Sequence, residues 1–181
     1  MNAISKVSFK AVNAIKAEYS ALYNLEGEAV DRKAVQQFQI KGVNALNKLV
    51  DEFSPDNLID QDLVALVIGS LTDLQVRDYA MGITTAENLN NLNNLWAFLT
   101  ATAPAGSIAP VATLWAITDY ELGNSALALE GLKVAQIDEA DYPLAKLILR
   151  VITAGWPKES FASMRAELHH KVIAGIFNEI E

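Results

Sequence analysis

The chain has 181 residues, of which 51% are hydrophobic and 20% are charged, so it can bury a core and is not a disordered chain. It contains no cysteine, which excludes a disulfide scaffold, thiol catalysis and cysteine-ligated zinc. No apolar run reaches the roughly 18–20 residues of a membrane-spanning helix, and the N-terminus has no apolar block typical of a signal peptide, so we expect a cytoplasmic protein.

Charge is distributed unevenly along the chain. Residues 1–50 hold seven basic and four acidic side chains, and residues 146–181 hold five and four. Residues 51–145 hold two basic and fourteen acidic side chains, a net charge of −12, while the whole chain carries −8. Such a segment repels nucleic acid and anionic membranes, so we expect neither as a direct partner. Its acidic residues form either a solvated surface or a face for a basic partner.

The first fifty residues show helical periodicity. Residues 4–24 place apolar side chains on one side and lysine and asparagine on the other, and Gly27 ends this segment. Residues 29–52 repeat the pattern. The spacing predicts two helices that form an antiparallel hairpin within residues 1–53.

Three helix starts follow in the next fifty residues. Asp60 is placed to cap a short helix that runs to Leu71. The sequence TDLQ at 72–75 has the pattern of a capping box and predicts a helix that ends near Gly82. A second capping box, TTAE at 84–87, predicts the start of a helix with Trp96 inward and five asparagines on a solvated face or a polar contact surface.

The second half of the chain has clear helix boundaries. A loop at 103–107 precedes a helix that Ser107 would cap and that Gly123 would end. Helices at about 125–137 and 142–154 follow, and the breaker Gly-Trp-Pro at 155–157 separates them from a final helix at about 158–179. That helix is predicted to face inward with Phe161, Met164, Leu168, Val172 and Ile176.

The predicted fold class is therefore all-α, with about nine helices and no sheet. We expect a single domain over residues 1–181, made of the hairpin at 1–53, a helical core at 58–157 and the C-terminal helix at 158–181.

One helix pair resembles a tetratricopeptide-type repeat over residues 109–142. The small residues Ala116, Ala128 and Ala135 stand where two helices of such a hairpin approach closely. Many helical hairpins satisfy this pattern, so a helical repeat and a generic bundle both remain open.

Three segments in order resemble an actinobacterial family, domain-of-unknown-function family 4192. They are LTDLQVRDYA at 71–80, the run from Leu114 to Ala128, and EADYPLA at 139–145. The chain is similar to the family over about residues 58–162, with Ser125 and Ala140 departing from its glycine and proline. The resemblance implies a helical fold and an origin in actinobacteria or their phages. It also implies that an α/β half found in family members is missing here, and it implies no reaction.

No pattern predicts catalysis, a cofactor or a metal. The pair Glu167 and His170 has the spacing of half a di-iron site, but there is no second such motif, and His169 and His170 are interpreted as surface residues of the last helix. Neither a glycine-rich phosphate loop nor a nucleophile elbow is present. We therefore expect a non-enzymatic protein.

Candidate partner-binding residues come from three places. Arg77 is one of two basic residues in the acidic segment and precedes Asp78. It is expected either to pair with a carboxylate such as Asp73 or to face a partner. Trp156 is either a core anchor or a residue that inserts into a partner. If the repeat analogy holds, a partner groove is lined by Thr113, Ile117 and Tyr120.

These observations favour a helical protein–protein interaction or adaptor module. The alternative is an acidic phage or host regulator that acts as a decoy and inhibits a nucleic-acid-binding protein. The basic first segment, the acidic middle and the apolar last helix also predict a homodimer.

Overall fold

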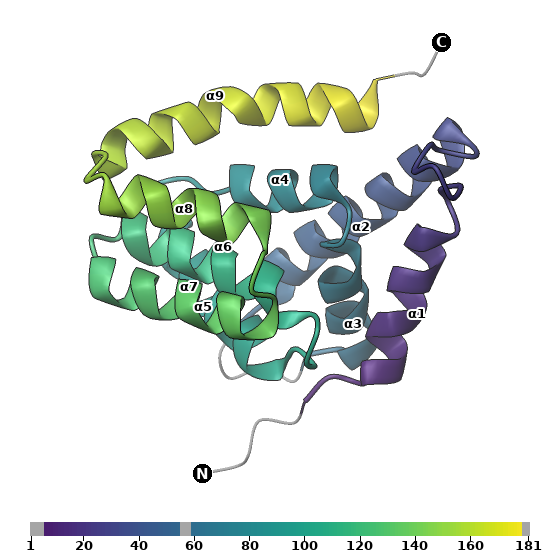
Figure 1. The fold of residues 1–181 in the computed structure, drawn as a ribbon, viewed down its shortest axis with the longest axis horizontal. Coiled ribbons are helices and arrows are strands. Elements are labelled where there is room, and N and C mark those ends of the chain that lie inside the picture. The colour runs from purple at the N-terminus through teal and green to yellow at the C-terminus, as the bar shows by residue number, and fades with distance from the viewer. Residues whose placement is uncertain (1–5, 55–58, 179–181) are drawn as a thin grey trace.

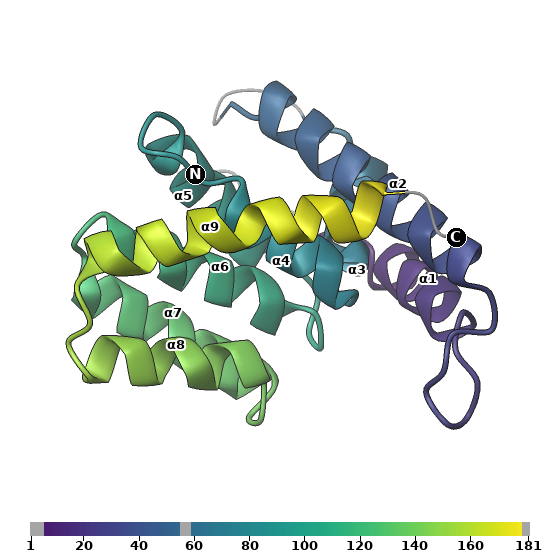
Figure 2. The same cartoon turned by 90° about the horizontal axis from the view of Figure 1, so that it is seen from above.

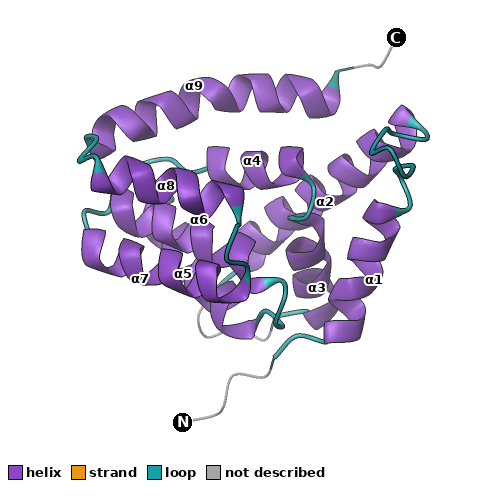
Figure 3. Cartoon of the chain, in the orientation of Figure 1, coloured by secondary structure: helices purple, strands orange, loops and turns teal. Residues whose placement is uncertain are grey.

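A computed structural model describes residues 6–54 and 59–178 of the chain, so the ends of the predicted helices at 4–24 and 158–179 lie partly outside the described residues (Figure 1). The described part contains nine helices and no strand, which confirms the all-α prediction (Figure 3). The helices are α1 (Phe9–Ser20), α2 (Arg32–Glu52), α3 (Gln61–Ser70), α4 (Leu74–Gly82), α5 (Leu89–Thr102), α6 (Ile108–Glu121), α7 (Ser125–Asp138), α8 (Pro143–Thr153) and α9 (Lys158–Phe177).

Aspartates start three of the first four helices. Asp31, Asp60 and Asp73 each accept hydrogen bonds from backbone N–H groups in the first turn of α2, α3 and α4. The predicted start of α4 was therefore one residue early, because Asp73 and not Thr72 is the cap. Helix α5 begins at Leu89, later than predicted, since Thr85 and Asn88 bond reciprocally and hold a turn before it.

Helix α6 lies at the centre of the second half. Ten of its fourteen residues are buried, because it packs against α5, α7 and α8 and also contacts α4 and α9. Its closest neighbour is α7, where a Cβ at Gly131 would lie 3.1 Å from Cβ of Ala116. The predicted small residues Ala116, Ala128 and Ala135 are all buried. Gly123, at a φ of +88°, ends α6 as predicted.

The first two helices, which were predicted as a hairpin, are joined mainly through the third helix. Helices α1 and α2 both pack mainly on α3, so the third helix holds them together. Their direct contacts are side-chain ones, such as Tyr19 with Phe38 and Lys41 with Glu18. The buried apolar side chains form one cluster with members from the start of α1 to α9.

Helix α9 lies across one side of the molecule, above α4 in Figure 1 and over α4 and α6 when seen from above (Figure 2). It packs mainly on α4 and contacts α2 and α6. Phe161, Met164, Val172 and Ile176 face inward as predicted. Leu168 does not, since it is 41% exposed, and Arg165 is buried in its place.

Candidate functional site

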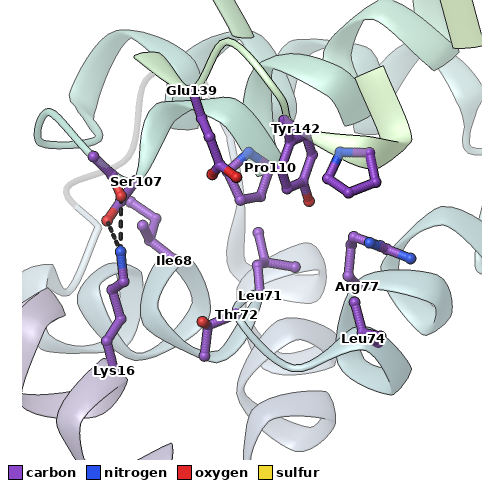
Figure 4. A pocket seen from close by; sticks show the side chains of 12 residues that line it. Lys16, Ile68, Leu71, Thr72, Leu74, Arg77, Ser107, Pro110, Glu139 and Tyr142 are labelled. Atoms are coloured by element: carbon purple, nitrogen blue, oxygen red, sulfur yellow. Dashed lines mark hydrogen bonds between the residues drawn. The ribbon is translucent and has the colours of Figure 1, made fainter. Parts of the chain in front are cut away.

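A pocket of about 210 Å³ opens where α3 and α4 meet α6 and the start of α8 (Figure 4). Its floor is apolar, and its rim carries a lysine, an arginine, a glutamate, a threonine and a tyrosine. The lining residues are Lys16, Ile68, Leu71, Thr72, Leu74, Arg77, Gly106, Ser107, Pro110, Glu139, Tyr142 and Pro143. Lys16 crosses from α1 and donates to the carbonyl oxygen of Gly106 at 2.7 Å, which ties α1 to the loop before α6.

Arg77 pairs with a carboxylate, but with its neighbour Asp78 and not with Asp73. Its Nε and Nη2 both donate to Oδ1 of Asp78, at 3.0 and 2.6 Å. Asp73 is occupied elsewhere, since it caps α4 and accepts from the buried amide of Gln39. The Arg77 side chain is mostly buried and the Asp78 side chain is about one-third exposed. Arg77 thus forms part of the pocket wall, and Asp78, which does not line the pocket, holds the guanidinium in place.

The electrostatics of this wall follow from its enclosure. Burial lowers the pKa of Arg77, but the hydrogen bonds and charge of Asp78 outweigh it and the pKa is raised. Burial raises the pKa of Tyr142, and the nearby Arg77 opposes that shift. The pocket therefore presents a charged guanidinium and a neutral phenol at neutral pH.

The three residues predicted to line a partner groove do not line an open surface. Thr113 and Ile117 are 0% and 1% exposed, and Tyr120 is 7% exposed, because α7, α8 and α9 cover α6. Thr113 donates to the carbonyl oxygen of Ala109, and the Tyr120 hydroxyl donates to that of Trp156. Trp156 itself is 38% exposed and packs edge-on against Phe161, so it serves both as an anchor and as part of the surface.

A second polar centre, which the sequence analysis missed, lies beneath α9. Arg165 is 3% exposed and forms a two-bond ion pair with Glu121 of α6, at 2.7 and 2.8 Å. Its Nη1 donates to the carbonyl oxygens of Met81, Gly82 and Thr84, at 3.3, 3.3 and 2.7 Å. The guanidinium therefore neutralises a buried carboxylate and satisfies the free carbonyls at the end of α4.

His169 follows Arg165 by one turn and is half-buried, so the surface prediction is correct for His170 and wrong for His169. Its ring packs against Tyr79, with centroids 5.1 Å apart, and lies directly against the backbone of Gly82. Its Nδ1 is buried and has no hydrogen-bond partner. Burial, and then the charges of His170 and Arg165, lower the pKa of His169, which favours the neutral ring.

Among residues 6–54 and 59–178, no group of three His, Asp or Glu side chains lies together in a way that would hold a metal ion. In the same part of the chain, no helix is both long and apolar enough to cross a membrane.

The geometry defines an all-helical protein with a polar-rimmed pocket at α4 and a buried arginine under its last helix. The chain belongs to the family described as Domain of unknown function (DUF4192), whose family model matches residues 6–159. The match begins at residue 6, so the first two helices belong to the family segment. The predicted start of the family resemblance, at about residue 58, was therefore too far along the chain. No curated protein matches the chain, and no solved structure matches it.

Proposed function

We propose that this protein is a non-enzymatic helical interaction module, and that the pocket beside α4 receives a side chain of a protein partner. The observation that carries the proposal is an apolar floor beside an exposed leucine and a fixed ion pair. Leu74 is 59% exposed at the pocket rim, next to Arg77 and Asp78. An exposed apolar anchor beside an ordered arginine is the composition of a protein interface.

The size of the pocket supports the same function. Its volume of about 210 Å³ lies below the roughly 300–1,000 Å³ of pockets that enclose a small-molecule ligand. It is close to the 150 Å³ or so that holds a single benzene ring. One side chain of a partner fits this space, with the rest of the partner lying over α4.

The alternative function, an acidic decoy, is less well supported by the positions of the acidic residues. Among the carboxylates of the acidic segment that the structure describes, at least eight have partners inside the protein or are buried. Asp60, Asp73 and Asp138 cap helices, Asp78 and Glu121 pair with arginines, Glu52 and Asp141 pair with lysines, and Asp119 is buried. The acidic surface is therefore smaller than the net charge of −12 implies.

Three finer proposals accompany this function. The close packing of α6 on α7 supports a tetratricopeptide-like hairpin, with Gly131 opposite Ala116. The family supports, as a proposal, an origin in actinobacteria or their phages, and we propose a cytoplasmic location for the protein.

An affinity-capture experiment with matched variants tests the function. The tagged full chain, Leu74→Asp and Leu127→Asp are incubated with an actinobacterial lysate. Leu127, 43% exposed on α7, is the control for an exposed leucine outside the pocket. We expect a partner that the chain and Leu127→Asp capture equally, and that Leu74→Asp captures at least tenfold less.

Salt separates the two functions, because about 1 M salt shortens the Debye length to about 3 Å. An interface anchored by Leu74 persists at that salt concentration. A basic partner that is released by salt and captured equally by all three chains would contradict the proposal and favour the decoy. Circular dichroism of each variant checks that it is folded.

A further inference from the structure

The surface beneath α9 holds this helix through three features, and all three come from other parts of the chain. They are the carboxylate of Glu121 with the carbonyl oxygens at the end of α4, the bare backbone at Gly82, and the amide of Gln36 on α2. We call this surface the α9 groove. Each feature lies within residues 6–159, the segment that the family model matches, whereas nearly all of α9 lies beyond it.

The polar part of the groove is selective for arginine. Glu121 is 6% exposed in its side chain, and the carbonyls of Met81, Gly82 and Thr84 converge with it on one guanidinium. Only arginine carries five N–H donors in a planar fork that reaches a carboxylate and several carbonyls together. An apolar side chain in its place would leave a buried carboxylate without a partner.

The other two features fix the position of a helix along the groove. A Cβ at Gly82 would lie 2.6 Å from Cγ of His169. Only a glycine at this position of α4 therefore leaves room for a bulky side chain that follows the arginine by one helical turn. Gln36 donates to the carbonyl oxygens of Ile176 and Asn178, at 3.0 and 2.6 Å, and so caps the C-terminal end of the helix.

Helix α9 itself is held by few buried side chains. Three of its twenty residues are buried, namely Phe161, Arg165 and Ile176. It packs mainly on α4 and more lightly on α2 and α6. When α9 leaves, Glu121 and the carbonyls regain water, so opening the groove leaves no charge stranded in the core.

We propose that the α9 groove is a docking site for an amphipathic helix of a protein partner, and that α9 occupies it in the free protein. The partner helix carries an arginine, an apolar residue four positions before it and another eleven positions after it, as α9 does with Phe161, Arg165 and Ile176. This inference rests on the proposed interaction function and gives it a second binding surface, which only opens when α9 moves aside.

A labelled peptide tests the groove directly. The full chain is titrated into a fluorescein-labelled peptide with the sequence of residues 158–178, and fluorescence anisotropy reports binding. We expect saturable binding that an unlabelled copy reverses. We expect the peptide with Arg165→Met to bind at least tenfold more weakly, since it cannot satisfy Glu121.

A disulfide that holds α9 in place is the matched control. A Cβ at Gly82 would lie 3.0 Å from Cβ of His169, which is closer than the roughly 3.5–4.5 Å of a disulfide. A small outward shift of α9 therefore brings the thiols of Gly82→Cys and His169→Cys into bonding geometry, and the chain has no other cysteine. Probed with a peptide carrying His169→Ala, the oxidised variant should bind at least tenfold more weakly than the same variant after reduction.

Two results would overturn the inference. One is equal binding by the oxidised and reduced variants, which would place the peptide outside the groove. The other is the absence of peptide binding. That result would overturn the inference both when hydrogen exchange shows that α9 opens by itself and when it shows that α9 opens only with global unfolding. This titration uses purified protein and does not depend on a partner that binds through Leu74. If the chain binds the peptide but captures no partner through Leu74, the groove proposal stands and the pocket-based function is refuted.

Discussion

Gly82→Ala adds a single methyl group at a point where α9 lies directly against α4. The new Cβ would be 2.6 Å from Cγ and 3.0 Å from Cβ of His169, and closer still to Nδ1. Because the Cβ atom of His169 is itself too near, rotating the imidazole ring does not remove the overlap. Helix α9 must move away from α4.

The expected loss of stability follows from these distances. An ordinary contact begins at about 3.4 Å, so the approach to Cγ is short by about 0.8 Å. Overpacking of this kind costs about 1–3 kcal/mol, and the better helix propensity of alanine returns up to about 1 kcal/mol. We expect a net loss of about 1–2 kcal/mol, or a fall in Tm of about 2–8 °C for a chain of this length.

Urea unfolding followed by circular dichroism measures the loss, and hydrogen exchange shows whether α9 loses protection first. Gly175→Ala is the control, because Gly175 is an exposed glycine on the same helix. The nearest atom to the new Cβ is the flexible end of Gln75, at 3.3 Å. This substitution should therefore stabilise the protein by about 0.5–1 kcal/mol. His169→Ala should restore part of the stability of Gly82→Ala, because it removes the overlap with the ring and leaves the approach to Cβ at 3.0 Å. An unchanged Gly82→Ala protein with full protection in α9 would refute the placement of His169 against Gly82.

Four further predictions address the fold and assembly. Since the native pKa of His169 is lowered below the unfolded value of 6.5, the free energy of unfolding should fall as pH drops through 6.5 towards the native pKa; NMR titration showing a native pKa at or above 6.5 would contradict this. Ala128→Leu should cost about 1–3 kcal/mol by separating α6 from α7, and an unchanged Tm would argue against that close packing. Asp138→Ala should cost about 1–2 kcal/mol in urea unfolding, because it removes the acceptor for three N–H groups at the start of α6; a loss within about 0.5 kcal/mol would show that the cap is dispensable. Sedimentation equilibrium at micromolar concentration should give a homodimer, and a persistent 19.7 kDa species would exclude it.

Local signals in the sequence predicted the helices well, because their boundaries depend on nearby residues. Asp60 and Gly123 mark a start and an end, and the structure has both. Ser107 shows the limit of local signals. It occupies the cap position of α6 but makes no capping bond, since the carboxylate of Asp138 from α7 takes the N–H groups instead.

The polar centre under α9 was missed because each of its members has an ordinary local interpretation. Arg165 interrupts an otherwise apolar inward face, and a helix pattern alone assigns such a residue to the surface. Its position becomes meaningful only when Glu121, forty-four residues earlier, is known to lie opposite. The one available sequence signal was the position of Arg165 on the same helix face as the stripe residues Phe161 and Ile176.

The cap that Asp138 provides to α6 has a consequence for folding during synthesis. The carboxylate follows the N–H groups it satisfies by 29–32 residues. At about 5–20 residues per second, a ribosome needs about 2–6 s to reach it after the start of α6 has been made. During that interval the most buried helix of the protein has an open end and no α7 to cover it. We expect α6 and α7 to acquire protease resistance as one cooperative unit, and arrested chains that stop before and after Asp138 should differ sharply in their resistance.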